Sequence, residues 1–189
     1  MFLNPFEDFS ERDLFIVGVI GFIGTVLLSY FGRVVFDGII QIHIAPTKFS
    51  TILLGNLSNV TILVIGMLVM AKIVYRKTRF IDILNNVLIS RIPIFLTGIL
   101  VCGLGKVIPV GRIAEEGFAF GKVLQSSDMV NIALLSIFCL FFIVYFFYLL
   151  VVGIRHSMNS KKLGHGFLIV VLVFILDAIA LLIYRSLFI

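Results

Sequence analysis

The chain has 189 residues, of which 61% are hydrophobic and only 13% are charged. Soluble domains contain about 25% charged residues, so this composition excludes an ordinary water-soluble protein and indicates a lipid environment. The formal net charge is +5, but the basic residues are scattered between apolar runs rather than gathered on one face. We therefore predict an integral membrane protein and expect no nucleic-acid partner.

Five apolar runs approach the ~20 residues that a helix needs to cross the hydrocarbon core of a bilayer. They cover residues 14–32, 51–71, 87–105, 129–153 and 166–184, and charged or polar segments separate them. We predict an all-α fold, an integral membrane bundle of five transmembrane helices. One domain is expected to cover residues 1–189.

Small residues recur every three or four positions in the first run, which places them on one helical face. Small side chains let a neighbouring backbone approach closely in lipid, so we predict a helix-packing surface. The alternative is that membrane helices are simply rich in glycine. The predicted surface consists of Gly18, Gly21, Thr25 and Ser29.

The link after the first run has the pattern of an extended segment. From Ile40 to Ile44, apolar and polar residues alternate with the period of a half-buried strand. Asp37 and Gly38, just before them, are a turn signal. We expect a short extended loop in which His43 is a surface histidine rather than a ligand.

Asn56 and Asn59 lie in the first half of the second run, where an unpaired amide costs several kcal/mol. Asn59 shares a helical face with Gly55 and Gly66. We therefore expect Asn59 to point at another helix and to hydrogen-bond there, and a binding site is the alternative.

The stretch 72–93 begins with basic residues and continues as an amphipathic segment. Its polar edge includes Asp82, Asn86 and Ser90, and we expect this edge to pack within the protein. Pro93 interrupts the segment, which predicts a short amphipathic helix leading into the third span. Arg91 is expected to snorkel toward the interface, and a buried cation is the alternative.

Asp177 lies near the middle of the last run, and a carboxylate at bilayer depth is a functional hypothesis by default. A structural role is the competing interpretation, with a protonated Asp177 hydrogen-bonded to Asn59, Thr25 or a tyrosine. The candidate intramembrane polar site consists of Asp177, Asn59, Asn56 and Arg91.

Positive residues are more numerous on the cytoplasmic side of membrane proteins. With five spans, the N-terminus shares a face with the second and fourth links, and nine basic residues lie there against six on the other face. We therefore predict a cytoplasmic N-terminus. The basic links expected to meet lipid contain Lys72, Arg76, Lys77, Arg79, Arg155, Lys161 and Lys162.

The spacing of the spans, the acidic N-terminus and the segment DILNNVLISRIP at 82–93 resemble the Yip family of small multi-pass membrane proteins. FDGII at 36–40 and ISRIP at 89–93 are similar to its bacterial members. The resemblance covers nearly the whole chain and implies the five-helix fold and, for a bacterial protein, the inner cell membrane. Eukaryotic members are associated with vesicle traffic and carry a DLxGP-like segment, which this sequence lacks, so only the fold is carried over.

Three functions compete. The first is a noncatalytic membrane-organising or scaffold protein whose basic links contact anionic lipid. The second is a small transporter or channel that uses Asp177 within the bundle. The third is a membrane enzyme, which we do not expect because the histidines at 43, 156 and 165 lack metal-ligand spacing. We expect no catalytic residues, cofactor or metal; the partner is the lipid bilayer, with a second copy or another membrane protein left open.

Overall fold

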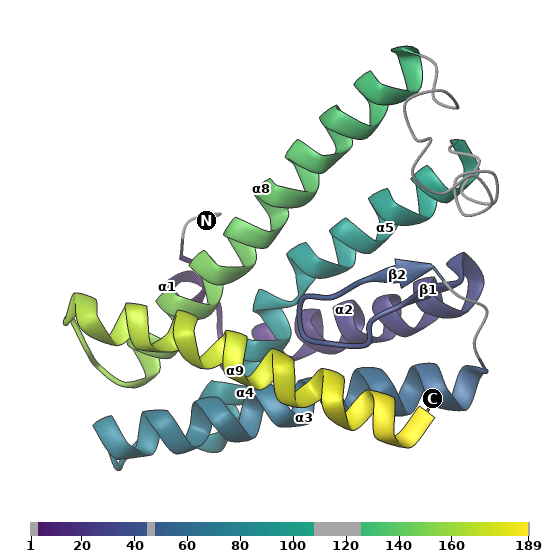
Figure 1. The fold of residues 1–189 in the computed structure, drawn as a ribbon. Coiled ribbons are helices and arrows are strands. Elements are labelled where there is room, and N and C mark those ends of the chain that lie inside the picture. Colours follow the sequence, from purple (N-terminus) through teal and green to yellow (C-terminus); the bar gives the residue numbers. More distant parts are fainter. Residues whose placement is uncertain (1–3, 45–47, 108–125, 189) are drawn as a thin grey trace.

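The computed structural model describes residues 4–44, 48–107 and 126–188. Almost all of the described chain is helical, so the all-α prediction is confirmed (Figure 1). The elements are α1 (Pro5–Asp8), α2 (Glu11–Gly32), β1 (Val34–Val35), β2 (His43–Ile44), α3 (Phe49–Val74), α4 (Phe80–Ser90), α5 (Ile92–Val107), α8 (Ser126–Ser157) and α9 (Leu163–Phe188).

Five helical segments are long and apolar enough to cross a membrane, as predicted. The third of these includes all of α4, so the amphipathic helix is part of the spanning segment and the segment begins at Phe80 rather than near residue 87. The segments are Glu11–Gly32, Phe49–Val74, Phe80–Gly103, Val130–Ser157 and Leu163–Leu187.

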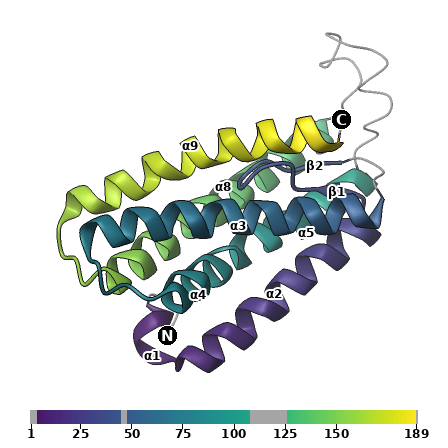
Figure 2. The same ribbon diagram turned by 90° about the horizontal axis from the view of Figure 1, so that it is seen from below.

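Close contacts at glycines show how the helices run. A Cβ on Gly18 would lie 2.6 Å from the Cβ of Leu88, and one on Gly32 would lie 2.9 Å from the sulfur of Cys102. Helix α2 therefore runs parallel to α4 and α5. Helices α3 and α9 run antiparallel, since Gly55 meets Tyr184 at one end and Gly66 meets Leu176 further along (Figure 2).

The break between α4 and α5 follows from the sequence. Proline lacks the backbone N–H that would continue the hydrogen-bond ladder, so Pro93 is tolerated only in the first turn of a new helix. Helix α4 accordingly ends at Ser90, and α5 begins at Ile92.

Side chains between the helices form one apolar core, while many large apolar side chains remain exposed around the bundle. Such an exterior is expected for helices surrounded by lipid. The fully enclosed residues include Leu63, Met67, Ile83, Val87, Phe146, Leu150, Ile169 and Val173, and the exposed ones include Ile20, Phe31, Ile65, Phe141 and Phe174.

Strands β1 and β2 form an antiparallel hairpin inside the bundle. Val34 pairs with Ile44 and Val35 with His43, and the residues between them form the tip of the hairpin. We call residues 34–44 the buried hairpin, because Val34, Phe36 and Ile39 are at most 1% exposed. The hairpin lies between α5 and α9, at the end of the bundle opposite α1 (Figures 1 and 2). The expected extended loop is therefore present, and His43 is exposed.

Candidate functional site

The carboxylate of Asp177 on α9 binds the tip of the buried hairpin. Its Oδ1 accepts hydrogen bonds from the backbone nitrogens of Ile39 at 2.6 Å and Ile40 at 3.1 Å. Its Oδ2 accepts one from Nε2 of Gln41 at 3.2 Å. A carboxyl group at bilayer depth is expensive unless its oxygens have hydrogen-bond partners. Oδ1 of Asp177 thus holds the backbone of the hairpin tip, and Oδ2 holds the side chain of Gln41.

Asn59 on α3 binds the backbone carbonyl groups of the same hairpin tip. The Asn59 Nδ2 donates to the oxygen of Phe36 at 2.9 Å and to that of Gly38 at 2.8 Å. At a rise of 1.5 Å per residue, Asn59 lies about 15 Å along α3 from its start at Phe49. Non-helical backbone at such a depth is tolerated only where protein or water satisfies its polar groups. We call Asp177 and Asn59 the polar clamp.

Two glycines make room for the hairpin. A Cβ on Gly38 would lie 2.5 Å from Oδ1 of Asp177, so a side chain there would displace the carboxylate. A Cβ on Gly98 of α5 would lie 2.8 Å from the ring of Phe36. The tip therefore fits between α5 and α9 because both positions lack a side chain.

Arg91 lies at the junction of α4 and α5 and is only 7% exposed, so the expectation that it snorkels is wrong. Arg91 and Asp177 are both among the buried polar residues of the described chain. Nη1 and Nη2 of Arg91 have no hydrogen-bond partner in the described part of the chain.

Asn56 is buried but stands apart from the polar clamp. Its Nδ2 donates to the oxygen of Ile52 in the same helix at 3.0 Å, and its Oδ1 has no partner among the described residues. Thr25 likewise donates to the oxygen of Gly21 in its own helix. The hairpin thus joins two of the predicted polar residues, Asp177 and Asn59.

The predicted packing surface on α2 faces the third spanning segment. Gly18 lies against Leu88, and a Cβ on Gly21 would be 3.1 Å from Cγ1 of Ile92. Thr25 and Ser29 are buried in the same row, and the hydroxyl of Ser29 donates to the oxygen of Thr25.

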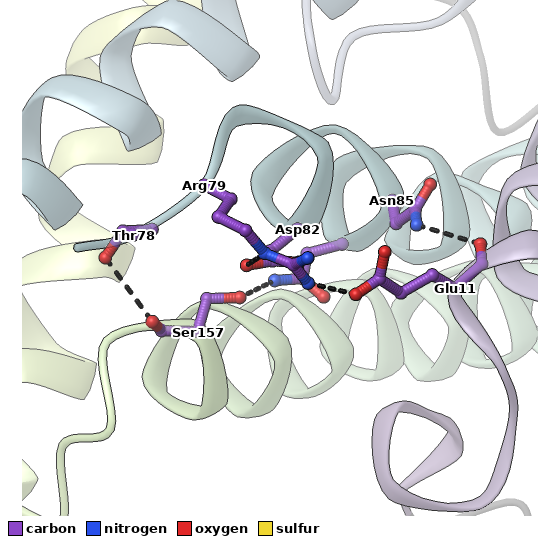
Figure 3. A network of polar contacts seen from close by, with 7 residues as sticks. Glu11, Thr78, Arg79, Asp82, Asn85 and Ser157 are labelled. Atoms are coloured by element: carbon purple, nitrogen blue, oxygen red, sulfur yellow. Dashed lines mark hydrogen bonds and ion pairs between the residues drawn. The ribbon is translucent and has the colours of Figure 1, made fainter.

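A second polar network ties together the end of the bundle that carries α1 (Figure 3). Arg79 donates to Glu11 and, at 2.8 Å, to Asp82. Nδ2 of Asn85 donates to the backbone oxygen of Glu11 at 3.1 Å. The hydrogen bonds of Asp82 and Glu11 to the Arg79 guanidinium raise its pKa above the ordinary arginine value.

The last residue of α8, Ser157, lies at the same end of the bundle. Nδ2 of Asn86 donates to the hydroxyl of Ser157 at 2.7 Å. The hydroxyl of Thr78 donates to the backbone oxygen of Ser157 at 3.3 Å (Figure 3). The N-terminus, the link 75–79 and the link 158–162 therefore share one face, which we call the N-terminal face.

The predicted basic residues are all at or near this face, in two different situations. Arg79 is neutralised by two carboxylates, and Arg155 donates to the backbone oxygens of Ser160 and Lys161. The exposed side chains with no ion pair to a described residue are Lys72, Arg76, Lys77, Lys161 and Lys162.

Sequence reasoning included Asn85 in the polar edge of residues 80–90 but missed two residues that hold this network, Glu11 and Ser157. The one available signal was the polar edge of residues 80–90, but its partners come from distant segments. Among the described residues, no three His, Cys, Asp or Glu side chains gather in a way that could hold a metal ion.

Comparisons of the chain with protein-family models, with curated proteins and with solved structures find no match. The fold itself, with five helices able to cross a membrane and a buried hairpin between them, defines an integral multi-pass membrane protein.

Proposed function

We propose that the chain is a noncatalytic membrane-organising or scaffold protein of the Yip-like type, with its N-terminal face in the cytoplasm. The observation that carries the proposal is the use of both Asp177 oxygens to bind the hairpin. A carboxylate engaged in this way supports a fixed architecture rather than a proton or substrate relay.

The exposed cations of the N-terminal face support contact with anionic lipid. Lys72, Arg76 and Lys77 lie close together at the end of α3 and in the link after it. Each basic residue near an anionic membrane surface contributes about 1 kcal/mol, which is roughly a fivefold change in affinity.

The proposal is tested by reconstituting the protein with spin-labelled lipids and measuring the preference for anionic over zwitterionic lipid. Replacing Lys72, Arg76 and Lys77 with Gln should reduce this preference strongly. A matched variant replaces Arg33, Lys48 and Arg185, which are spread over separate elements, and should have a smaller effect. A protein indifferent to anionic lipid, or equal losses in both variants, would count against the proposal.

A small transporter or channel is the second candidate, and the buried Arg91 favours it. A buried arginine whose Nη1 and Nη2 have no hydrogen-bond partner among the described residues is the kind of group that lines an ion pathway. In proteoliposomes this candidate requires an ion flux that Asp177→Asn and Arg91→Gln each abolish. The absence of flux, or a flux unchanged in both variants, would remove it.

A further inference from the structure

Two adjoining cavities open at the N-terminal face. The first has a volume of about 270 Å³, and its lining includes Glu11, Arg79, Asp82 and Asn85. The second has a volume of about 450 Å³, and Glu7, Arg155 and Lys161 are among the residues that line it. His156 lines both cavities, so they are neighbours across one side chain.

The charges of the two cavities are opposite. In the first, the carboxylates of Glu11 and Asp82 outnumber the single guanidinium of Arg79, which leaves one net negative charge. In the second, Arg155 and Lys161 outnumber Glu7, which leaves one net positive charge. A zwitterion with a cationic and an anionic group a short distance apart would match both.

Carboxylates are the acceptors that the first cavity offers to a ligand. Asn85 lines this cavity, but it is 2% exposed and its Nδ2 already donates to the backbone oxygen of Glu11. Its Oδ1 is buried away from solvent and has no hydrogen-bond partner within the described residues. The side chains of Glu11 and Asp82 therefore supply the acceptors for a ligand with N–H donors.

We propose that the two cavities together bind the ethanolamine phosphate headgroup of an aminophospholipid. The primary ammonium occupies the first cavity, where it donates to a carboxylate of Glu11 or Asp82. The phosphate occupies the second cavity, beside Lys161 and the guanidinium of Arg155. Lipid headgroups lie at the ends of spanning helices, which is where the cavities are. Lys72, Arg76 and Lys77 line neither cavity, whereas Lys161 is also one of the exposed cations of the N-terminal face.

Phosphatidylcholine is the matched control lipid, because it carries the same phosphate but its quaternary ammonium has no N–H donor. The full chain in detergent is mixed with phosphatidylethanolamine, phosphatidylcholine or phosphatidylglycerol of equal acyl chains, and bound lipid is measured by native mass spectrometry. We expect phosphatidylethanolamine to bind roughly tenfold more tightly than phosphatidylcholine, as for the loss of one charge-assisted hydrogen bond. Phosphatidylglycerol measures the separate contact of the exposed cations with anionic lipid. Equal binding of phosphatidylethanolamine and phosphatidylcholine would overturn the proposal.

Two pairs of variants locate the site. Asp82→Asn removes the negative charge of the first cavity, and its control is Asp13→Asn, since Asp13 lines neither cavity. Lys161→Gln acts on the second cavity, and its neighbour Lys162→Gln is the control. We expect the preference for phosphatidylethanolamine to fall about tenfold in the first variant of each pair only.

Lys161 is an exposed side chain, so we expect its replacement to leave the fold intact, and the test does not depend on the folding of Asp82→Asn. Equal losses in Lys161→Gln and Lys162→Gln would contradict the site. Soluble phosphoethanolamine serves as a separate arm. If it binds the protein and phosphatidylethanolamine does not, the lipid assignment is wrong.

Discussion

Oδ1 of Asp177 lies 2.6 Å from the backbone nitrogen of Ile39, a residue 138 positions earlier in the chain. Through this contact the last spanning helix holds the link that follows the first one. Asn59 completes the attachment from α3, so three separate segments meet at the hairpin tip.

Removing the Asn59 amide should destabilise the protein. Asn59→Ala leaves the buried oxygens of Phe36 and Gly38 without their donor, and each such loss costs about 1–3 kcal/mol. Asn56→Ala is the matched control, because the Nδ2 of Asn56 binds only its own helix. Denaturant unfolding in mixed micelles measures the free energies of unfolding. Similar losses for both variants would show that Asn59 is not specially placed.

Adding a methyl group at Gly38 should displace the clamp. The new Cβ would lie 2.5 Å from Oδ1 of Asp177, so Gly38→Ala is expected to lower the unfolding temperature clearly. Gly103→Ala is the control, since nothing lies within 4 Å of the added atom. In that helical position alanine is favoured over glycine by up to about 1 kcal/mol. An unchanged unfolding temperature in Gly38→Ala would mean that Asp177 does not hold the hairpin tip tightly.

Asp177 and Arg91 should be energetically coupled. Asp177→Asn removes a negative charge from an interior that also buries Arg91, whereas in an Arg91→Met background the same change faces no buried cation at that position. A double-mutant cycle should therefore give a coupling of about 1–3 kcal/mol, larger than the ~0.5 kcal/mol seen for independent sites. Arg79→Met is the control partner, because Arg79 is bound to Glu11 and Asp82 at the N-terminal face. Additive effects of Asp177→Asn and Arg91→Met would contradict the coupling.

The orientation can be measured with a membrane-impermeant maleimide on cysteine variants that lack Cys102 and Cys139. We expect Lys77→Cys to react only from the cytoplasmic side and Lys48→Cys only from the outside, because these residues lie at opposite ends of α3. Both side chains are exposed, so access does not limit the reaction. The reverse pattern would place the N-terminus outside.

The spans were predictable because apolar length alone decides which helices can cross a membrane. Asp177 and Asn59 were also recognisable from the sequence, since polar groups in apolar runs must find partners. The hairpin could not be recognised as their partner. Asn59 was expected to form a hydrogen bond with another helix, but it forms its hydrogen bonds with the hairpin. No local pattern at residues 36–41 indicates that their backbone groups bind side chains of distant helices.

The surroundings of Arg91 and Arg79 were likewise not predictable from the local sequence. Near the end of an apolar run, an arginine usually snorkels, and only the break at Pro93 and the path of α5 place Arg91 inside. Arg79 looked like one more free cation of a basic link, but it is neutralised by Glu11, which lies 68 positions away in sequence. Pairings across such separations depend on how the helices pack, which hydropathy does not encode.

The most direct test of the polar clamp is hydrogen–deuterium exchange at the backbone amides of Ile39 and Ile40. In the wild-type protein both amides should exchange slowly, since each donates to Asp177 from a buried or partly buried residue. In Asp177→Asn their exchange should accelerate at least tenfold, while the exposed control Asp13→Asn leaves it unchanged. Fast exchange of these amides in the wild-type protein, or no acceleration in Asp177→Asn, would contradict the account.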